Sequence, residues 1–172
     1  NPHTGNWPGK TVANAQGRYR HQDTNFVPVD IPGTYSLMAN SEEEEIARDF
    51  ICFGGPDAVV VVADATCRER NLNLVLQTME ISKRVVLCVN LLDEAKKKKI
   101  QIDLKALSEK LGIPVVGTSA RNGKGLNRLM DAVTDLTRGR SETSPMEITY
   151  GEEIERAISI LEPALDDTLT EG

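Results

Sequence analysis

The sequence is poor in the residues that mark several classes of protein. Only 4% of its 172 residues are aromatic, and its three cysteines, Cys52, Cys67 and Cys88, lie far apart with no C-x-x-C spacing. An odd number of scattered cysteines argues against a disulfide framework and favours free thiols in a reducing compartment. No apolar run approaches the roughly 18 residues of a membrane helix, and no signal-peptide pattern opens the chain. We therefore expect the segment to work in cytosol-like water.

Acidic residues outnumber basic ones, with 26 Asp and Glu against 20 Lys and Arg. The formal net charge is −6 and hydrophobic residues make up 40% of the chain, which is the composition of an ordinary acidic globular protein. Bulk attraction to nucleic acid or to anionic lipid is therefore not expected. A run of four lysines at residues 96–99 is interpreted as a solvated turn. The length fits one domain with the start of an appendage.

The most informative stretch is residues 84–93, Arg-Val-Val-Leu-Cys-Val-Asn-Leu-Leu-Asp. Its five consecutive apolar residues predict a strand that is buried on both faces of a parallel sheet. Ligands of open α/β sheets lie beyond the carboxyl ends of strands, where Asn90 and Asp93 stand. A carboxylate can accept from the ring N–H and exocyclic amine of guanine while an amide donates to a ring acceptor, and adenine lacks that donor pair. A turn residue followed by a helix cap is the alternative interpretation.

Three further polar segments stand where chemistry is expected. Asp30 follows a strand predicted for residues 25–30 and is suited to holding a metal through water, while Gly33 offers an unobstructed N–H to a phosphate oxygen. The loop at residues 1–12 presents the Thr11 hydroxyl to a metal-bound phosphate or, alternatively, forms an anchored turn. Small residues at 118–120 would let a backbone amide approach a purine carbonyl.

The remaining pattern predicts an α/β fold, with a mostly parallel, doubly wound sheet after an antiparallel hairpin. Ser41 is predicted as an N-cap with Glu44 at the capping-box position. Residues 122–125 are interpreted as a turn into a helix. The expected elements are a hairpin over residues 12–22 and 25–30, helices over 41–54, 72–79, 103–111 and 126–136, strands over 57–64 and 113–117, a linker over 141–145 and a helix over 150–165.

The order of the polar segments resembles the regulatory GTPase fold, a P-loop-GTPase-like sheet flanked by helices. Four segments refine this resemblance: Gly-Asn-Trp-Pro-Gly-Lys-Thr-Val at 5–12, Asp-Ile-Pro-Gly-Thr-Tyr-Ser-Leu at 30–37, Asp-Ala-Thr at 64–66 and Asn-Leu-Leu-Asp-Glu-Ala at 90–95. In these segments the chain resembles the N-terminal G domain of the FeoB ferrous iron transporter family. The resemblance covers almost the whole chain and implies a G domain over residues 1–140, then a linker and the beginning of a helical regulatory domain over residues 141–172.

On the phosphate side, the resemblance implies that Thr11 coordinates Mg²⁺ and the γ-phosphate. Asp30 would hold Mg²⁺ through water, and the Gly33 amide would contact the γ-phosphate. Thr34 follows Gly33 where many small GTPases place a water-orienting Gln, so no catalytic residue is certain and hydrolysis is expected to be slow.

On the base side, the resemblance implies that Asn90 and Asp93 read guanine. The Ala120 amide would contact the guanine oxygen, and Ser119 would support that loop. Leu91 stands where most GTPases have Lys, a departure that the family shares.

No G-x-x-x-x-G-K-[ST] phosphate loop occurs in the sequence. We expect the first strand and this loop upstream of Asn1, so that the polypeptide alone binds guanine nucleotide very weakly and hydrolyses none measurably. The absent strand would lie between the strands ending at Asp30 and Asp64, and its loss would leave a slot of about 10 Å. Either those strands close up or the polypeptide is unstable and prone to aggregate.

The implied function is a guanine-nucleotide-binding switch that binds GTP or GDP with Mg²⁺ and hydrolyses GTP slowly to regulate Fe(II) uptake. The implied partners are guanine nucleotide and a C-terminal transmembrane transport domain of the same protein, without nucleic acid. The implied location is the cytoplasmic side of a bacterial inner membrane. A monovalent cation as an additional cofactor and homo-oligomerisation stay open.

Two alternatives to this function remain. A degenerate G domain would act as a non-hydrolysing interaction module, but such a scaffold would not need Thr11, Asp30, Asn90 and Asp93. A soluble GTPase of ribosome assembly shares the motifs, but this chain shows no basic domain for binding RNA.

Overall fold

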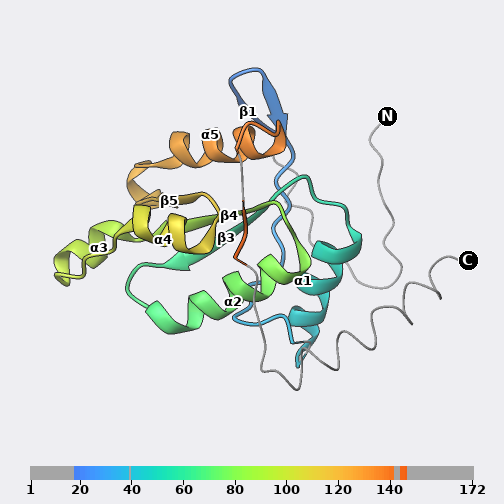
Figure 1. The fold of residues 1–172 in the computed structure, drawn as a ribbon, viewed down its shortest axis with the longest axis horizontal. Coiled ribbons are helices and arrows are strands. Elements are labelled where there is room, and N and C mark those ends of the chain that lie inside the picture. The colour runs from blue at the N-terminus through green and yellow to red at the C-terminus, as the bar shows by residue number, and fades with distance from the viewer. Residues whose placement is uncertain (1–17, 39, 142–143, 147–172) are drawn as a thin grey trace, which may run out of the picture.

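The computed structural model describes residues 18–38, 40–141 and 144–146. Its main sheet has three parallel strands in the order β3 (Val59–Asp64), β4 (Val85–Asn90) and β5 (Val115–Gly117). Helices lie on both sides of this sheet, with α5 (Leu126–Thr137) on one side and α2 (Arg68–Ile81) on the other (Figure 1). The predicted α/β class and the parallel sheet are confirmed.

Strand β4 is the centre of the core. All of its residues except Asn90 are buried, because helices cover both faces of the strand. On one face, Val85, Leu87 and Val89 join a cluster with residues of α2 and α4 (Leu104–Leu111). On the other face, Val86 packs with residues of α5. The continuous apolar run in the sequence therefore forms a strand that is buried on both faces, as predicted.

Helix α1 (Glu42–Phe53) begins as predicted at Ser41, whose hydroxyl accepts from the Glu44 N–H at 3.2 Å. The reciprocal half of the predicted capping box differs. The Glu44 carboxylate accepts from the N–H of Asn40 at 3.0 Å, one residue before the cap. The buried side of the helix, Ala47 and Ile51, packs against Leu37 in a separate small cluster.

The hairpin is shorter than expected. Strands β1 (Tyr19–His21) and β2 (Thr24–Phe26) form their own two-stranded sheet, and residues 27–30, predicted as strand, have no regular structure. Pro28 has no N–H to donate to a ladder, which explains why the pairing ends before it. The beginning of the predicted hairpin, residues 12–17, lies outside the described residues.

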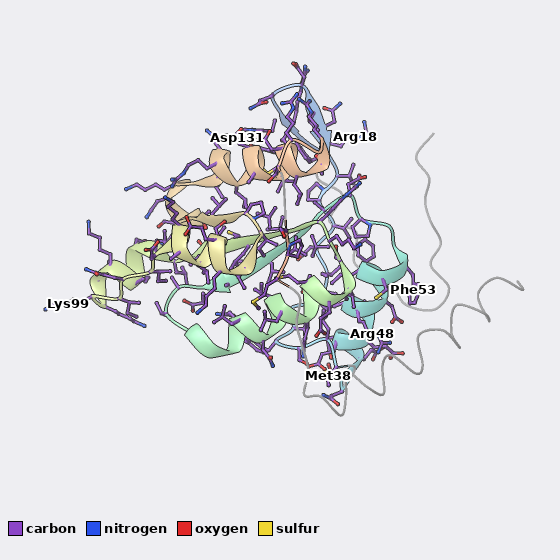
Figure 2. All side chains as sticks on the ribbon, viewed as in Figure 1. Arg18, Met38, Arg48, Phe53, Lys99 and Asp131 are labelled. Carbon is purple, nitrogen blue, oxygen red and sulfur yellow. The ribbon has the colours of Figure 1, made fainter. Side chains whose placement is uncertain are left out.

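The hairpin is fastened to α5. The Asp131 carboxylate of α5 contacts His21 Nε2 at 2.6 Å and accepts from Gln22 Nε2 at 2.9 Å. Arg138 at the end of the same helix donates to the Thr24 hydroxyl at 2.6 Å. Figure 2 shows Asp131 on the side of α5 that faces the hairpin.

Strand β3 is an edge of the main sheet. It pairs with β4 in register, with Val60 beside Val86 and Val62 beside Cys88. Yet Val60 is 38% and Val62 is 60% exposed, whereas both β4 partners are buried. Because the hairpin and β3 belong to different sheets, the strands on either side of the expected slot have not closed up into one.

Two connections complete the fold. A short helix, α3 (Leu92–Lys97), was not predicted from the sequence. The lysine run at residues 96–99, predicted as a turn, is half helical, because its first two lysines end α3 and its last two lie in the turn that follows. After α5 the chain returns to the end of α4, where the N–H groups of Ser144 and Met146 donate to the carbonyls of Gly112 and Leu111 at 3.1 and 3.0 Å. In the described part of the chain no helix combines the length and the apolar character needed to cross a bilayer.

Candidate functional site

The sheet brings two of the predicted polar segments together. In the parallel register, Val89 of β4 lies beside Gly117 of β5, so that both strands end at the same edge. The Thr118 N–H donates to the Val89 carbonyl at 2.8 Å, and the Leu92 N–H donates to the Thr118 carbonyl at 3.1 Å. The segments that follow β4 and β5 are thereby joined backbone to backbone.

The side chain of Asn90 is held in one orientation. Its Oδ1 accepts from the Thr118 hydroxyl and from the Ala120 N–H, both at 3.0 Å. Because a backbone N–H can only donate, the atom facing Ala120 must be the amide oxygen. The Asn90 NH₂ group makes no hydrogen bond within the described residues and stays available as a donor. This is the orientation needed to donate to a ring acceptor of a purine.

The same contact engages the N–H of Ala120. The resemblance assigns its N–H to the guanine oxygen, whereas here that N–H donates to Asn90. A guanine oxygen would have to share this N–H or take it over from Asn90.

Asp93 is positioned by the segment after β5. Its own N–H donates to the Ser119 hydroxyl, and its Oδ2 accepts from Asn122 Nδ2, both at 3.2 Å. Partial desolvation raises the pKa of Asp93, but the hydrogen bonds with Ser119 and with the backbone N–H groups of Asp93 and Glu94, together with the charge of Lys97, lower the pKa below its ordinary value overall. The carboxylate is therefore charged at neutral pH and able to accept two hydrogen bonds.

Backbone conformation allows this arrangement. Leu91, between the two base-reading candidates, has a φ of +63°, in the left-handed region where a side chain costs roughly 1 kcal/mol. The segment after β5 forms η1 (Ala120–Asn122) and turns into α5 at Gly125, as predicted. At Gly125 φ is +83° and an added Cβ would lie 2.3 Å from the Gly117 carbonyl oxygen, so only glycine fits.

Two residues of this cluster were not assigned a role from the sequence. Thr118 is 1% exposed, and its hydroxyl lies between Asn90 Oδ1 and the Cys88 thiol, whose Sγ is 3.3 Å away. Burial raises the pKa of Cys88 although the Thr118 hydrogen bond lowers it, so this thiol stays protonated. Asn122 is the other residue. A polar residue directly after a buried strand was the available signal for Thr118, and Asn122 gave no signal beyond its place in a turn.

Of the phosphate-side candidates, Asp30 and Gly33 are not part of this cluster. Thr11 lies outside the described residues. Asp30 and Gly33 are exposed, and no hydrogen bond links them to Asn90 or Asp93 among the residues that the structure describes. The Thr34 hydroxyl donates to the Ser36 carbonyl and accepts from the Ser36 N–H, which closes a small turn.

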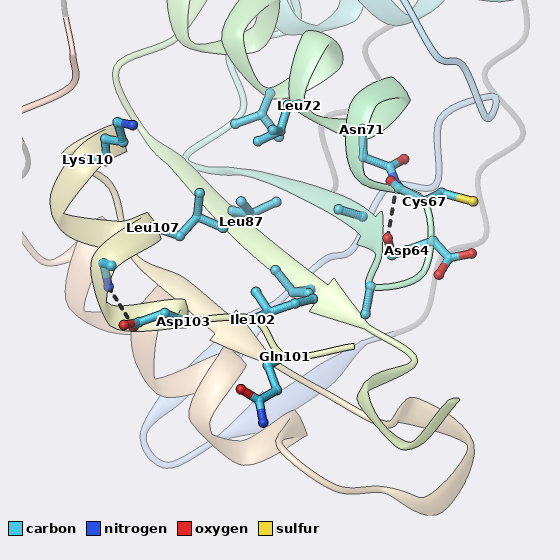
Figure 3. Close-up of a pocket in the computed structure, with 15 residues that line it drawn as sticks. Asp64, Cys67, Asn71, Leu72, Leu87, Gln101, Ile102, Asp103, Leu107 and Lys110 are labelled. Atoms are coloured by element: carbon cyan, nitrogen blue, oxygen red, sulfur yellow. Dashed lines mark hydrogen bonds between the residues drawn. The ribbon is translucent and has the colours of Figure 1, made fainter. Parts of the chain in front are cut away.

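A pocket of about 360 Å³ lies elsewhere, between α2 and α4 (Figure 3). Its floor is apolar and includes Val75, Leu87 and Leu107. Asp64 lies at its rim, where the hydrogen bond from the Thr66 N–H lowers the pKa of the carboxyl below its usual value despite some desolvation. Neither Asn90 nor Asp93 lines this pocket, so it lies apart from the base-reading candidates. Across the described residues, His, Cys, Asp and Glu form no group of three that would hold a metal.

Comparison with known proteins agrees with the resemblance. The family model described as "Ferrous iron transport protein B" matches residues 1–133. The chain is 40% identical over 170 residues to the Fe(2+) transport protein A/Fe(2+) transporter FeoB fusion protein of Porphyromonas gingivalis, covering 98% of this chain and 20% of that protein. It is 40% identical over 133 residues to the Fe(2+) transporter FeoB of Salmonella typhimurium, covering 75% of this chain and 17% of that protein. The chain thus spans about a fifth of the length of these curated relatives.

Solved structures give the same result. The cytosolic domain of T. maritima FeoB in a GDP form superposes with a TM-score of 0.86 at 39% identity, covering 94% of this chain and 64% of that one. Its GMPPNP form gives 0.85 at 40% identity with the same coverage. The FeoB G domain of Methanococcus jannaschii gives 0.70 at 41% identity, covering 75% of this chain and 83% of that one. The chain therefore belongs to the FeoB family of ferrous iron transport proteins and corresponds to its N-terminal G domain.

Proposed function

We propose that this chain is the guanine-nucleotide-binding switch of a ferrous iron transport protein, and that it binds GTP or GDP with Mg²⁺ and hydrolyses GTP slowly. The observation that carries the proposal is the pair of side chains after β4. Asn90 presents its NH₂ group because its oxygen is engaged, and Asp93 presents a charged carboxylate. Relatives of this chain were solved in GDP and GMPPNP forms.

The chemistry of this pair suits guanine. The ring N–H and the exocyclic amine of guanine are adjacent donors, and a carboxylate accepts both with its two oxygens. Adenine places an acceptor where guanine has its ring N–H, which would face the Asp93 charge. Discrimination of this kind is strong because the wrong base would leave a desolvated polar group unpaired.

On the phosphate side, the proposal assigns Mg²⁺ to Thr11 and Asp30. Asp30 is exposed, which suits a carboxylate that contacts a metal through water. The Gly33 amide would face the γ-phosphate, and apart from its chain neighbours no described residue has an atom within 4 Å of the position of an added Cβ there. A bound Mg²⁺ would neutralise phosphate charge.

Slow hydrolysis is supported by the residue after Gly33. Thr34 has no amide to orient a water, and its hydroxyl is engaged by Ser36. Backbone groups or a partner would then have to place the attacking water. Slow hydrolysis of GTP is better suited to regulating the uptake of Fe(II) than to supplying the energy for transport.

The wider assignment follows the relatives. We propose residues 1–140 as the G domain and residues 141–172 as a linker and the beginning of a helical regulatory domain, in a longer protein with a membrane transport domain. The G domain would lie on the cytoplasmic side of a bacterial inner membrane. The relative from T. maritima that superposes on this chain is a cytosolic domain of a FeoB iron transporter, which supports that placement.

The test is nucleotide selectivity in the full-length protein. We expect a fluorescent GDP analogue to be displaced by GDP and GTP and not by ADP or ATP. Asp93→Asn should reverse the preference from guanine to xanthine nucleotides, since an amide at this position complements the xanthine carbonyl and ring N–H. Equal displacement by adenine and guanine nucleotides would disprove the proposal.

A further inference from the structure

Asn122 is the neighbour of Asp93 that the family resemblance does not explain. It lies at the end of η1, and its Nδ2 donates to Asp93 Oδ2 at 3.2 Å. The two residues are 29 positions apart and come from segments that follow different strands. The contact therefore exists only when both segments are folded at the same edge of the sheet.

Other groups also contact the Asp93 carboxylate, namely the Ser119 hydroxyl and the backbone N–H groups of Asp93 and Glu94. The Ser119 hydroxyl accepts from the Asp93 N–H, and this interaction does not constrain the terminal torsion of the side chain. That torsion is broad for aspartate, so an exposed carboxylate samples many planes. The hydrogen bond from Asn122 Nδ2 to Asp93 Oδ2, at 3.2 Å, is a side-chain contact that restricts this torsion from the end of η1.

The contact leaves room for the base. A carboxylate has about four acceptor positions on its two oxygens, and Asn122 uses one of them. The ring N–H and exocyclic amine of guanine would use two more. The amide and the base can therefore be bound at the same time, with the amide holding the carboxylate plane.

We propose that Asn122 is a positioning residue for guanine selectivity, which orients the Asp93 carboxylate so that both of its oxygens accept from the base. The proposal rests on the guanine-binding function proposed above. A carboxylate fixed in plane favours a base with two adjacent donors over a base with one. Asn122 thereby contributes to discrimination between guanine and hypoxanthine, which lacks the exocyclic amine.

The experiment compares GDP with IDP, its hypoxanthine analogue, by competition against a fluorescent GDP analogue in the full-length protein. Asn122→Ala should weaken GDP about fivefold, as expected for one lost hydrogen bond at an exposed site. IDP should weaken by less than about twofold, since it makes one contact with the carboxylate. The GDP-to-IDP affinity ratio should therefore fall. Asn127→Ala, the same chemical change at an exposed position in the first turn of α5, should leave both affinities unchanged.

Two outcomes would overturn the inference. An unchanged ratio with equal losses for GDP and IDP would show that Asn122 only supports the loop, and unchanged affinities would show that it has no role. Failure of the wild-type protein to bind GDP would instead disprove the proposed function. If Asn122→Ala melts at a lower temperature than wild type, Asn122→Asp provides the second measurement. Its like charge should weaken GDP more than alanine does, and salt should reduce that extra loss.

Discussion

The two halves of the candidate nucleotide site are built in different ways. The base-side half, around Asn90 and Asp93, follows strands of the sheet and is tied by hydrogen bonds between side chains and backbone. The phosphate-side half, around Asp30 and Gly33, is an exposed segment of irregular structure with local turns. A purine edge has a fixed pattern that a rigid surface can match, whereas a phosphate group that is cleaved needs a segment able to rearrange. Mutations should therefore affect the two halves unequally.

The largest effect is expected at Asn90. In Asn90→Ala, the buried Thr118 hydroxyl and the Ala120 N–H both lose their acceptor, and the base loses a donor. We expect GDP affinity to fall about 100-fold and the free energy of unfolding to fall by about 2 kcal/mol. Calorimetric titration and urea denaturation measure the two quantities. A variant that binds GDP normally would mean that the base is not read at this strand end.

A smaller effect is expected for Thr118→Val. It keeps the side-chain shape but removes the donor to Asn90, so GDP affinity should fall about fivefold and stability by about 1 kcal/mol. The matched control is Thr134→Val in α5, which is also 1% exposed and whose hydroxyl donates to the Met130 carbonyl at 2.7 Å. The control should alter stability without altering GDP affinity. Equal losses of affinity in both variants would contradict the special role of Thr118.

Acid should weaken the binding of GDP by the base-side half, and only over a defined range of pH. Asp93 has a lowered pKa in the folded protein, so its contribution is complete above the unfolded value of about 3.9 and is lost as pH falls through the lower folded value. GDP affinity should thus be flat from about pH 8 to 5 as far as Asp93 is concerned. Ser119→Ala removes one hydrogen bond that lowers the pKa of Asp93, so the pH midpoint of the Asp93 titration should move upward. NMR titration of the Asp93 carboxyl carbon measures it, and a downward movement would contradict the explanation.

The smallest effect on the fold is expected at Asp30. Asp30→Asn alters an exposed side chain outside any regular element, so the free energy of unfolding should change by less than about 0.5 kcal/mol. The dependence of GTP binding on Mg²⁺ should change instead, toward higher midpoint concentrations. Thermal melts and a Mg²⁺ titration test both points. A destabilisation as large as that of Asn90→Ala would remove the contrast between the two halves.

The elements that sequence reasoning located well are those whose cause is local. The apolar run of β4, the Ser41 cap and the glycine turn before α5 each depend on a few adjacent residues. The strand predicted through Asp30 failed because strand formation needs a partner, and the residues beyond Phe26 have none in the described structure. Helix α3 was missed because its six residues are too few to show a periodic pattern.

Within the site, contacts between residues far apart in the sequence could not be predicted. The residue types at 90, 93, 119 and 120 located two segments that meet in the structure, because strand ends of a parallel sheet share an edge. The contact between Asn122 and Asp93 depends on a single turn of η1 and on the register of β4 with β5. No pattern in the residues near Asn122 encodes that register.

The path of the chain at Ser144, after α5, depends on the absence of a side chain at Gly112. At Gly112, φ is +68° and an added Cβ would lie 1.7 Å from the carbonyl oxygen of Ser144. Because Gly112 has no Cβ, it can adopt the left-handed conformation that ends α4, and the backbone at Ser144 can pass close to it. Any larger residue there would force the Ser144 carbonyl aside and disturb the hydrogen bonds by which Ser144 and Met146 join the end of α4.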